Sequence, residues 1–325
     1  VSGESTTSLL FSLSYALGRE FTGHENVVTT DYEHYANVSP WIELEKRGTI
    51  REVRFARLDK AEGTLDLDHL ENLIDGNTKV VTVTAASNVL GTKSSLHEIR
   101  KLARARGAYF VVDAVHHAPH GPIDVQAIDC DFLVFSGYKM FSSHGSFLYG
   151  KEDLLDRLKP YKVAPAKDEP PYKWEWGTRN QSMFAAISGV VDHLAWLADE
   201  IGSSYGKSVE AYSGRSRSLK IAMHAIEEYG QDLSRAILQG IDHLPGLLQM
   251  RRVKVYGLTD PNRLNERDPT FAFKVQGTPD QEVVQRLWNR YMVALRAEDF
   301  YSRVHAVYDT PTMVRASLVH YNTAE

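Results

Sequence analysis

The stretch DCDFLVFSGYKMFSSHG, residues 129–145, joins a strand-like apolar run to a lysine. Residues 132–135 are apolar without interruption, which is typical of a strand that is covered on both faces of a sheet. Lys139 follows directly, although lysine is among the residues least often buried because its ammonium group is costly to desolvate. This placement makes Lys139 a candidate functional residue.

The composition limits the classes of protein to consider. The chain has 325 residues, of which 43% are hydrophobic and 24% charged, as in a soluble globular protein with one large domain or two ordinary ones. The net charge of −5 is small and no basic stripe stands out, so nucleic-acid binding is not indicated. No apolar run approaches the roughly 20 residues of a membrane span, so no membrane association is expected.

The single cysteine, Cys130, excludes an intrachain disulfide and a cysteine-based zinc site. Without a signal peptide, this favours a cytoplasmic location. The first residues pass almost at once into a helical pattern, and the last follow directly on a strand-like segment. We therefore expect residues to be missing at both ends, including a segment at the N-terminus.

Strand-like and helical segments alternate through the first half of the chain. Strands are predicted at ENVVTT, IREVRFARL, TKVVTVTAA, AYFVVDAV and DFLVFSGY, and helices at residues 7–17, SPWIELEKRG, LDLDHLENLID and SLHEIRKLARARG. Continuous apolar strands between helices predict an α/β fold with a mostly parallel sheet that is covered on both faces.

A proline-rich loop at residues 160–174 and a long amphipathic helix follow, and the pattern then changes. Helices are predicted near 206–229 and 231–243, and strands at RRVKVYGL, TFAFKVQ, MVALRA and MVRASLVHY. We therefore predict a large α/β domain over residues 1–204 and a small α+β domain over residues 205–325.

The polar residues at the predicted strand ends form a coherent set. Asp113 and Lys139 each end an apolar strand, and ligands of parallel α/β sheets lie beyond these carboxyl ends. Ser5, Thr6 and Thr7 begin the first helix, where free amides favour an anion. Pyridoxal 5′-phosphate (PLP) needs a lysine amine, a carboxylate for its ring nitrogen and a phosphate site. The alternative is that Asp113 caps a helix and Lys139 is a solvated surface residue.

The order of the motifs supports the cofactor interpretation. The run VVDAVHHAPHGPIDVQAIDCDFLVFSGYKMFSSHGSFLYG resembles the cofactor core of the class V aminotransferases, and above all their group II cysteine desulfurase branch. EHYANVSPW, SNVLGT, WEWGTRN and VRASLVHYNT resemble that family's other motifs, in the same order. The resemblance covers nearly the whole chain. It implies PLP-dependent fold type I, with a seven-stranded sheet in the large domain, and a homodimer with shared active sites.

The resemblance also implies roles for individual residues. Lys139 would hold PLP as a Schiff base, Asp113 would pair with the pyridinium nitrogen, and His34 would stack on the ring. Asn88 and His116 would lie near the ring hydroxyl. The implied phosphate ligands are Thr6, Thr7, Ser136 and Tyr138, with Thr178 reaching across the dimer. Arg315 would bind the carboxylate of an amino-acid substrate, and Arg296 would assist.

Several positions depart from the family pattern. His116 stands where glutamine is usual, and Tyr138 replaces the histidine before the lysine. The loop that carries the attacking cysteine of desulfurases contains no cysteine here, and Tyr301 lies at or beside that position as a candidate substrate contact. Cys130 precedes a buried strand and is expected to be inert. The resemblance therefore implies a branch that lacks the catalytic cysteine.

Three outcomes are open after removal of a substrate Cα proton by Lys139: β-elimination, transamination and racemisation or epimerisation. The resemblance to desulfurases favours β-elimination from an amino acid or an S-conjugate, a C–S lyase reaction without a persulfide. A catalytically silent binding protein of the same fold is the alternative from another class. The cluster HHAPH at 116–120 raises the question of a metal, but adjacent histidines on a strand end point in opposite directions, and we expect no metal site.

Overall fold

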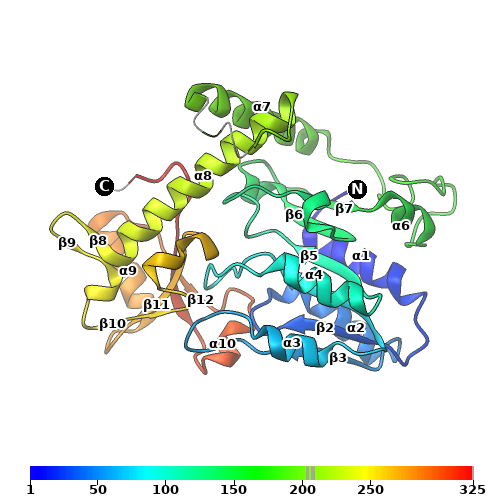
Figure 1. The fold of residues 1–325 in the computed structure, drawn as a ribbon, viewed down its shortest axis with the longest axis horizontal. Coiled ribbons are helices and arrows are strands. Elements are labelled where there is room, and N and C mark those ends of the chain that lie inside the picture. The colour runs from blue at the N-terminus through cyan, green and yellow to red at the C-terminus, as the bar shows by residue number, and fades with distance from the viewer. Residues whose placement is uncertain (203–204, 206–208, 324–325) are drawn as a thin grey trace.

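A seven-stranded sheet forms the centre of the larger part of the chain (Figure 1). We describe it from a computed structural model that covers residues 1–202, 205 and 209–323. In spatial order the strands are β1 Ser2–Gly3, β7 Ser146–Gly150, β6 Phe132–Ser136, β5 Tyr109–Asp113, β4 Thr78–Thr84, β2 Asn26–Thr30 and β3 Glu52–Ala56. Strands β6, β5, β4, β2 and β3 are mutually parallel, whereas β7 and β1 are antiparallel to their neighbours. The predicted α/β class with a mostly parallel seven-stranded sheet is confirmed.

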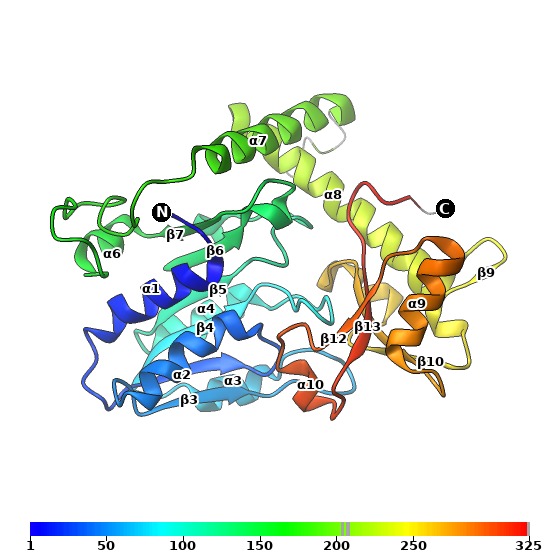
Figure 2. The ribbon, with the colours of Figure 1, turned by 180° about the vertical axis from the view of Figure 1, so that it is seen from behind.

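Helices cover both faces of this sheet (Figure 2). They are α1 Thr6–Gly18, α2 Ser39–Lys46, α3 Leu67–Leu73, α4 Leu96–Ala105, α5 Val125–Ile128 and α6 Glu152–Arg157, with the 3-10 turns η1 Tyr35–Asn37 and η2 Gly137–Met140. Side chains of α1 and α2 pack on one face with Val27 and Val111, and those of α3 and α4 pack on the other with Val28 and Val112. Because successive strand residues point to opposite faces, such continuous apolar strands supply both cores.

Two long helices that pack on each other, α7 Gln181–Ile201 and α8 Gly214–Gln239, lead from this sheet to a smaller one (Figures 1 and 2). The smaller sheet has the order β10 Val253–Tyr256, β11 Thr270–Val275, β13 Met313–Ser317 and β12 Arg296–Glu298, and is antiparallel. Its other elements are β8 Gly240–Ile241, β9 Leu244–Pro245, η4 Leu247–Gln249, η5 Pro261–Glu266, α9 Asp280–Tyr291 and α10 Val304–Val307. A C-terminal antiparallel sheet with helices agrees with the predicted α+β unit.

The prediction of separate helices near 206–229 and 231–243 was wrong, because α8 continues through Gly230 to Gln239. One glycine costs a helix only about 1 kcal/mol relative to alanine. The buried face of α8 outweighs that cost: Ile226 and Leu233 pack inward on either side of Gly230. The start of the first predicted helix at 206–208 lies outside the described residues, as does residue 204 at the predicted domain boundary, which remains a prediction.

Candidate active site

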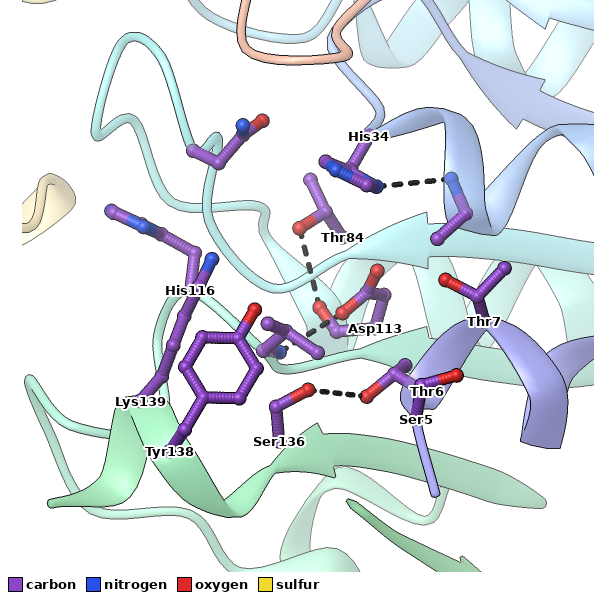
Figure 3. A pocket seen from close by; sticks show the side chains of 13 residues that line it. Ser5, Thr6, Thr7, His34, Thr84, Asp113, His116, Ser136, Tyr138 and Lys139 are labelled. Carbon is purple, nitrogen blue, oxygen red and sulfur yellow. Dashed lines mark hydrogen bonds between the residues drawn. The ribbon is translucent and has the colours of Figure 1, made fainter. Parts of the chain in front are cut away.

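A pocket opens where the carboxyl ends of β4, β5 and β6 meet the first turn of α1 (Figure 3). It contains about 520 Å³ of empty space. Its lining residues are Ser5, Thr6, Thr7, His34, Ala36, Thr84, Asn88, Asp113, Val115, His116, Ser136, Tyr138 and Lys139. Nine of the residues predicted from the sequence are therefore gathered around one cavity, although Thr6 and Ser136, for example, lie 130 positions apart in the chain.

Asp113, the last residue of β5, is the buried acid of this pocket. One carboxyl oxygen, Oδ1, accepts a hydrogen bond of 2.9 Å from the amide of Val115. Burial raises the pKa of Asp113 to about 6, although the Val115 amide and the charge of Lys139 act in the opposite direction. At neutral pH the carboxylate is therefore ionised, and the charge of Lys139 favours this form.

Lys139 lies in η2, the turn directly after β6, so the rigid strand delivers its side chain to the pocket. Burial, and then the positive charge of Arg315, lower the pKa of Lys139 to about 8, while Asp113 acts to raise it. A lysine with this pKa is partly unprotonated near neutral pH, whereas an ordinary lysine is almost fully protonated.

Hydroxyl groups meet the start of α1 at the opposite side of the pocket (Figure 3). The Oγ1 of Thr6 lies 2.7 Å from the Oγ of Ser136 and 3.2 Å from the Oγ of Ser146. Ser5 caps the helix by accepting from the Ser8 amide at 3.1 Å. The remaining free amides of the first turn and these hydroxyls can donate to an anion such as a phosphate.

His34 precedes η1 and extends its ring into the pocket from β2 (Figure 3). Its Nδ1 accepts a hydrogen bond of 3.0 Å from the amide of Ala36, which places the proton of the neutral ring on Nε2. Burial, and then the charges of Lys139 and Arg315, lower the pKa of His34 to about 4. The ring is therefore neutral at physiological pH, and it lies 6.0 Å from the ring of Tyr301, between ring centroids.

Arg315 on β13 reaches the same region from the smaller sheet. Its Nη1 donates to the main-chain oxygen of Asn88 at 2.8 Å, and its guanidinium lies 4.0 Å from the ring centre of Phe300. Asn88 in turn donates from Nδ2 to the main-chain oxygen of Phe300 at 3.0 Å, while its buried Oδ1 has no partner. Burial lowers the pKa of Arg315 to about 10, so the guanidinium stays charged and brings a cation to the pocket.

Besides Arg315, the structure leaves three predicted residues outside the pocket lining of their own chain. Thr178 lies exposed in the loop between α6 and α7, and its predicted role requires a partner subunit. Arg296 is exposed on β12, directly opposite Arg315 in the antiparallel register. Tyr301 is 68% exposed, and its loop is joined to the pocket by the bond of 2.8 Å from the amide of Tyr35 to its main-chain oxygen.

The histidines at 116–120 have different surroundings: one lines the pocket, and another contacts an acid just before β11 of the smaller sheet. His116 lines the pocket, its buried Nε2 has no partner, and its ring centre lies 5.2 Å from that of His120. His117 instead contacts Asp268, with Nδ1 3.1 Å from each carboxyl oxygen. No group of three or more His, Cys, Asp or Glu side chains among the described residues is arranged to hold a metal ion.

A comparison with known families matches residues 3–214 to the model of the class-V aminotransferases. The chain belongs to the class-V aminotransferase family. Over 336 residues it is 30% identical to a cysteine desulfurase of Serratia proteamaculans, with 98% of this chain and 73% of that protein covered. A cysteine desulfurase of Haloferax volcanii is also 30% identical, with 99% and 70% covered.

Solved structures agree with this family assignment. The apo structure of a cysteine desulfurase from Thermococcus onnurineus is 25% identical, with a TM-score of 0.79 over 99% of this chain and 75% of that one. The cysteine desulfurase CsdA from Escherichia coli has the same fold, with a TM-score of 0.81 at 23% identity, covering 100% and 75% of the two chains. The chain is thus a cysteine desulfurase-like enzyme of a PLP-dependent family whose members are typically dimeric.

The residues of this family member fit PLP by their own chemistry. A buried carboxylate, a lysine with a lowered pKa and a hydroxyl-lined helix start lie around one cavity. Two buried polar atoms in that cavity, Oδ1 of Asn88 and Nε2 of His116, have no partner in the protein. Buried polar atoms are normally hydrogen-bonded, so these two atoms indicate that a polar ligand completes the site.

The only cysteine of the chain is remote from this chemistry. Cys130 is fully buried and packs in the core between the sheet and helices α3 and α4. Burial, and then the negative charge of Asp131, raise the pKa of its thiol to about 12. A thiol in this environment is protonated at physiological pH and inaccessible to a substrate.

Two residues that order the site were not predicted. Thr84 ends β4, lines the pocket and donates from Oγ1 to the main-chain oxygen of Asp113 at 3.2 Å. Glu33 directly precedes His34 and is completely buried. A threonine at a strand end gives no separate sequence signal, but the acid in the motif EHYAN is unusual beside a buried strand, and it could have been noticed.

Among the described residues, no helix is both long and apolar enough to cross a membrane.

Proposed function

We propose that this chain is a PLP-dependent lyase that acts on an amino acid or an S-conjugate of one. In this proposal the enzyme removes the Cα proton and a group leaves from Cβ. The observation that carries the proposal is the pairing of Asp113 and Lys139 at the ends of adjacent strands, beside a hydroxyl-lined helix start. That combination provides each group that the cofactor requires.

Each part of PLP has a candidate partner in the pocket. Asp113 would hold the ring nitrogen, and His34 would cover one face of the ring. Asn88 and His116 would satisfy the ring hydroxyl with the atoms that now lack partners. The phosphate would lie against the start of α1, where the candidate ligands are Thr6, Thr7, Ser136 and Tyr138. When bound, PLP supplies an electron-withdrawing group that stabilises negative charge at the substrate Cα.

Lys139 would both bind the cofactor and move the proton. With cofactor and substrate bound, its Nζ would be free to accept the Cα proton. The pKa of about 8 keeps a substantial unprotonated fraction of this amine near neutral pH. The ionised carboxylate of Asp113, which accepts a hydrogen bond from the Val115 amide, would place a negative charge beside the ring nitrogen of PLP.

Arg315 would bind the substrate carboxylate. Its guanidinium is fixed by the Asn88 main-chain oxygen and by the ring of Phe300, so only part of its donor set is used by the protein. The remaining N–H groups suit a bidentate contact with a carboxylate. Tyr301, exposed beside His34, would contact the part of the substrate beyond Cβ, and Arg296 would add positive charge nearby.

We propose that sulfur leaves without a persulfide on the enzyme. A persulfide requires an accessible thiolate, and the only cysteine is buried with a raised pKa. The leaving group would therefore depart directly, and the product would be released as ammonia and a 2-oxo acid after hydrolysis. A homodimer, in which Thr178 of one subunit reaches the phosphate of the other, completes the proposal.

Incubation of the holoenzyme with a panel of L-amino acids and cysteine S-conjugates tests this function. Stoichiometric ammonia, 2-oxo acid and free thiol from an S-conjugate are expected. A 2-oxo acid without ammonia, with the cofactor left in its amine form, would favour transamination instead. Inversion at Cα without other products would favour an epimerase, and a protein that takes up no PLP would favour a silent binding protein.

A further inference from the structure

Strand β2, which lies between β4 and the edge strand β3, has a buried glutamate just outside each of its ends, and the two glutamates lie in opposite environments. Glu25 precedes the strand and accepts from the amides of Thr22, Gly23 and His24 at 2.8–3.1 Å. Glu33 follows the strand at the pocket end and is completely buried. Only Glu33 lies beside the proposed cofactor site.

The carboxyl group of Glu33 connects the end of β2 to the end of β4. Its Oε1 contacts the Thr30 hydroxyl at 2.6 Å and the Thr84 amide at 2.9 Å. Its Oε2 accepts from Nδ2 of Asn37 at 2.8 Å, and Oδ1 of Asn37 accepts from the Thr82 hydroxyl at 2.7 Å. With the Asn37 amide turned over, its Oδ1 would instead accept the proton of a neutral Glu33, and its Nδ2 would donate to Thr82. Glu33 therefore fastens the segment of His34 to β4, whose last residue contacts the main chain of Asp113.

The main chain of Glu33 also anchors the loop that carries Tyr301. Its oxygen accepts from the amide of Arg303 at 3.2 Å and from the hydroxyl of Ser302 at 3.2 Å. One residue thus contacts three segments that border the pocket: the His34 turn, the end of β4 and residues 301–303.

The charges around Glu33 do not neutralise it. The nearby ionisable group on β5 is Asp113, an acid of the same sign. On its own segment, Tyr32 is fully buried with a raised pKa, and His34 is neutral. Arg303 from the facing loop is already paired with Asp31 at 3.0 Å. Two buried carboxylates without a shared cation cannot both remain ionised at low cost, and Asp113 is the one that has Lys139 nearby.

We propose that Glu33 is a positioning residue that acts as a neutral carboxylic acid, which orders the walls of the proposed PLP site and leaves its buried negative charge to Asp113. The inference rests on the proposed function for its meaning, but its ionisation can be measured without cofactor. In agreement with its complete burial beside Asp113, the pKa of Glu33 is raised to about 8, although the hydrogen bonds of Thr30, Asn37 and Thr84 act in the opposite direction.

Glutamine is the natural mimic of a neutral glutamic acid at this position. In Glu33→Gln the side-chain oxygen can still accept from Thr30 and Thr84. The new amide can donate to the Oδ1 of Asn37 if the Asn37 amide turns over, and Asn37 can then donate to Thr82. If Glu33 is neutral, the substitution preserves the network, whereas Glu33→Leu removes it.

The first test measures urea unfolding of the full chain, freed of PLP, between pH 5 and 8. A wild-type Glu33 that stays protonated in the folded state loses that proton on unfolding. Its unfolding equilibrium constant should therefore rise, relative to that of Glu33→Gln, by up to tenfold per pH unit. Contributions from Asp113 are common to both proteins and cancel in the ratio.

Glu25→Gln is the matched control. Although burial opposes it, the hydrogen bonds of Thr22 and the neighbouring amides lower the pKa of Glu25, so this residue is ionised from pH 5 upward. The ratio of unfolding constants for wild type and Glu25→Gln should stay flat across the same range. A flat ratio for Glu33→Gln as well would overturn the proposal.

The second test uses infrared spectroscopy of the wild-type protein, so that it does not depend on a variant that folds. The carbonyl band of a protonated carboxyl group should be present at pH 7 and lost at pH 9. It should persist in Glu25→Gln and be absent from Glu33→Gln. No such band at pH 7 in wild type would also overturn the proposal.

PLP titration then separates this inference from the proposed function. Glu33→Gln should bind PLP within threefold of wild type, and Glu33→Leu at least tenfold more weakly, because the walls of the site lose their order. If wild type binds no PLP, the proposed function fails while the unfolding result still stands. Equal PLP affinity for wild type and Glu33→Leu would show that Glu33 does not position the site.

Discussion

Asp113 and Lys139 lie at the ends of two adjacent parallel strands, with Asp113 on β5 in register with Val134 on β6. Burial drives their pKa values toward each other, up to about 6 for Asp113 and down to about 8 for Lys139. The positive charge of Lys139 opposes the rise in the pKa of Asp113, and the negative charge of Asp113 opposes the fall in the pKa of Lys139. The sheet thus holds an acid and a base in one pocket with their proton affinities brought near neutrality, as catalysis at physiological pH requires.

Replacing Lys139 by methionine should abolish PLP binding and stabilise the cofactor-free protein. A lysine whose folded pKa is lowered carries a penalty that is complete below about pH 8 and disappears as the pH rises toward 10.5. Removing it should raise the free energy of unfolding at pH 7 by roughly 3.5 kcal/mol, given about 1.4 kcal/mol per pKa unit. Absorbance and urea unfolding measure the two effects.

Lys151→Met is the control for that stability prediction. Lys151 follows β7 and bonds Asp129 at 2.7 Å and Asp131 at 2.9 Å, and these acids raise its pKa although burial opposes them. Its loss should lower stability and leave PLP binding intact. If Lys139→Met destabilises the protein as Lys151→Met does, then the buried charge of Lys139 does not cost the folded protein stability, and this explanation is wrong.

PLP affinity should fall as the pH drops below about 6. In that range Asp113 takes up a proton and no longer offers a negative charge to the ring nitrogen. Asp113→Asn should remove this pH dependence and weaken PLP binding by about 3 kcal/mol, or roughly a hundredfold, because a buried charged partner is lost. Fluorescence titration of PLP from pH 5 to 8 checks both outcomes, and an unchanged pH profile in the variant would count against the assignment.

Cys130→Ala should retain full lyase activity. The side chain is buried in the core, so the substitution should cost about 1–2 kcal/mol of stability through lost packing. Mass spectrometry during turnover of cysteine or an S-conjugate should find no added sulfur on Cys130 in wild type. Detection of a persulfide there, or loss of turnover in the folded variant, would refute the direct release of sulfur.

Arg315→Ala should raise KM for the substrate by about tenfold to a hundredfold, as expected when a charged hydrogen-bond donor of 1.5–3 kcal/mol is removed. Arg296→Ala provides the comparison, because Arg296 is exposed on the neighbouring strand and should change KM less. Steady-state kinetics with one S-conjugate decides the point. A larger effect at Arg296 would mean that Arg296, and not Arg315, binds the substrate carboxylate.

Much of the fold could be predicted from the sequence because its signals are local. The continuous apolar runs that became β5 and β6 predicted a covered parallel sheet, and residues that follow such strands must share an edge. The position of Lys139 and Asp113 in one pocket follows from this rule. The family resemblance added His34 and His116, which have no local signal of their own, and gave a role to Asn88.

Other features depend on contacts between distant residues. Gly230 suggested a helix end, but packing along α8 carried the helix through it. The importance of Glu33 arises from its contact with Thr84, 51 positions away, and this contact cannot be read from the letters EHYAN. Likewise the orientation of Arg315 depends on Asn88, 227 positions earlier in the chain.

Reduction of the PLP-loaded enzyme with borohydride, followed by peptide mass mapping, tests the central assignment most directly. We predict one phosphopyridoxyl group per chain, on the peptide that contains Lys139, and none in Lys139→Met. A protein that retains no PLP, or a modification at a different lysine that persists in Lys139→Met, would contradict the assignment of this pocket as the PLP site.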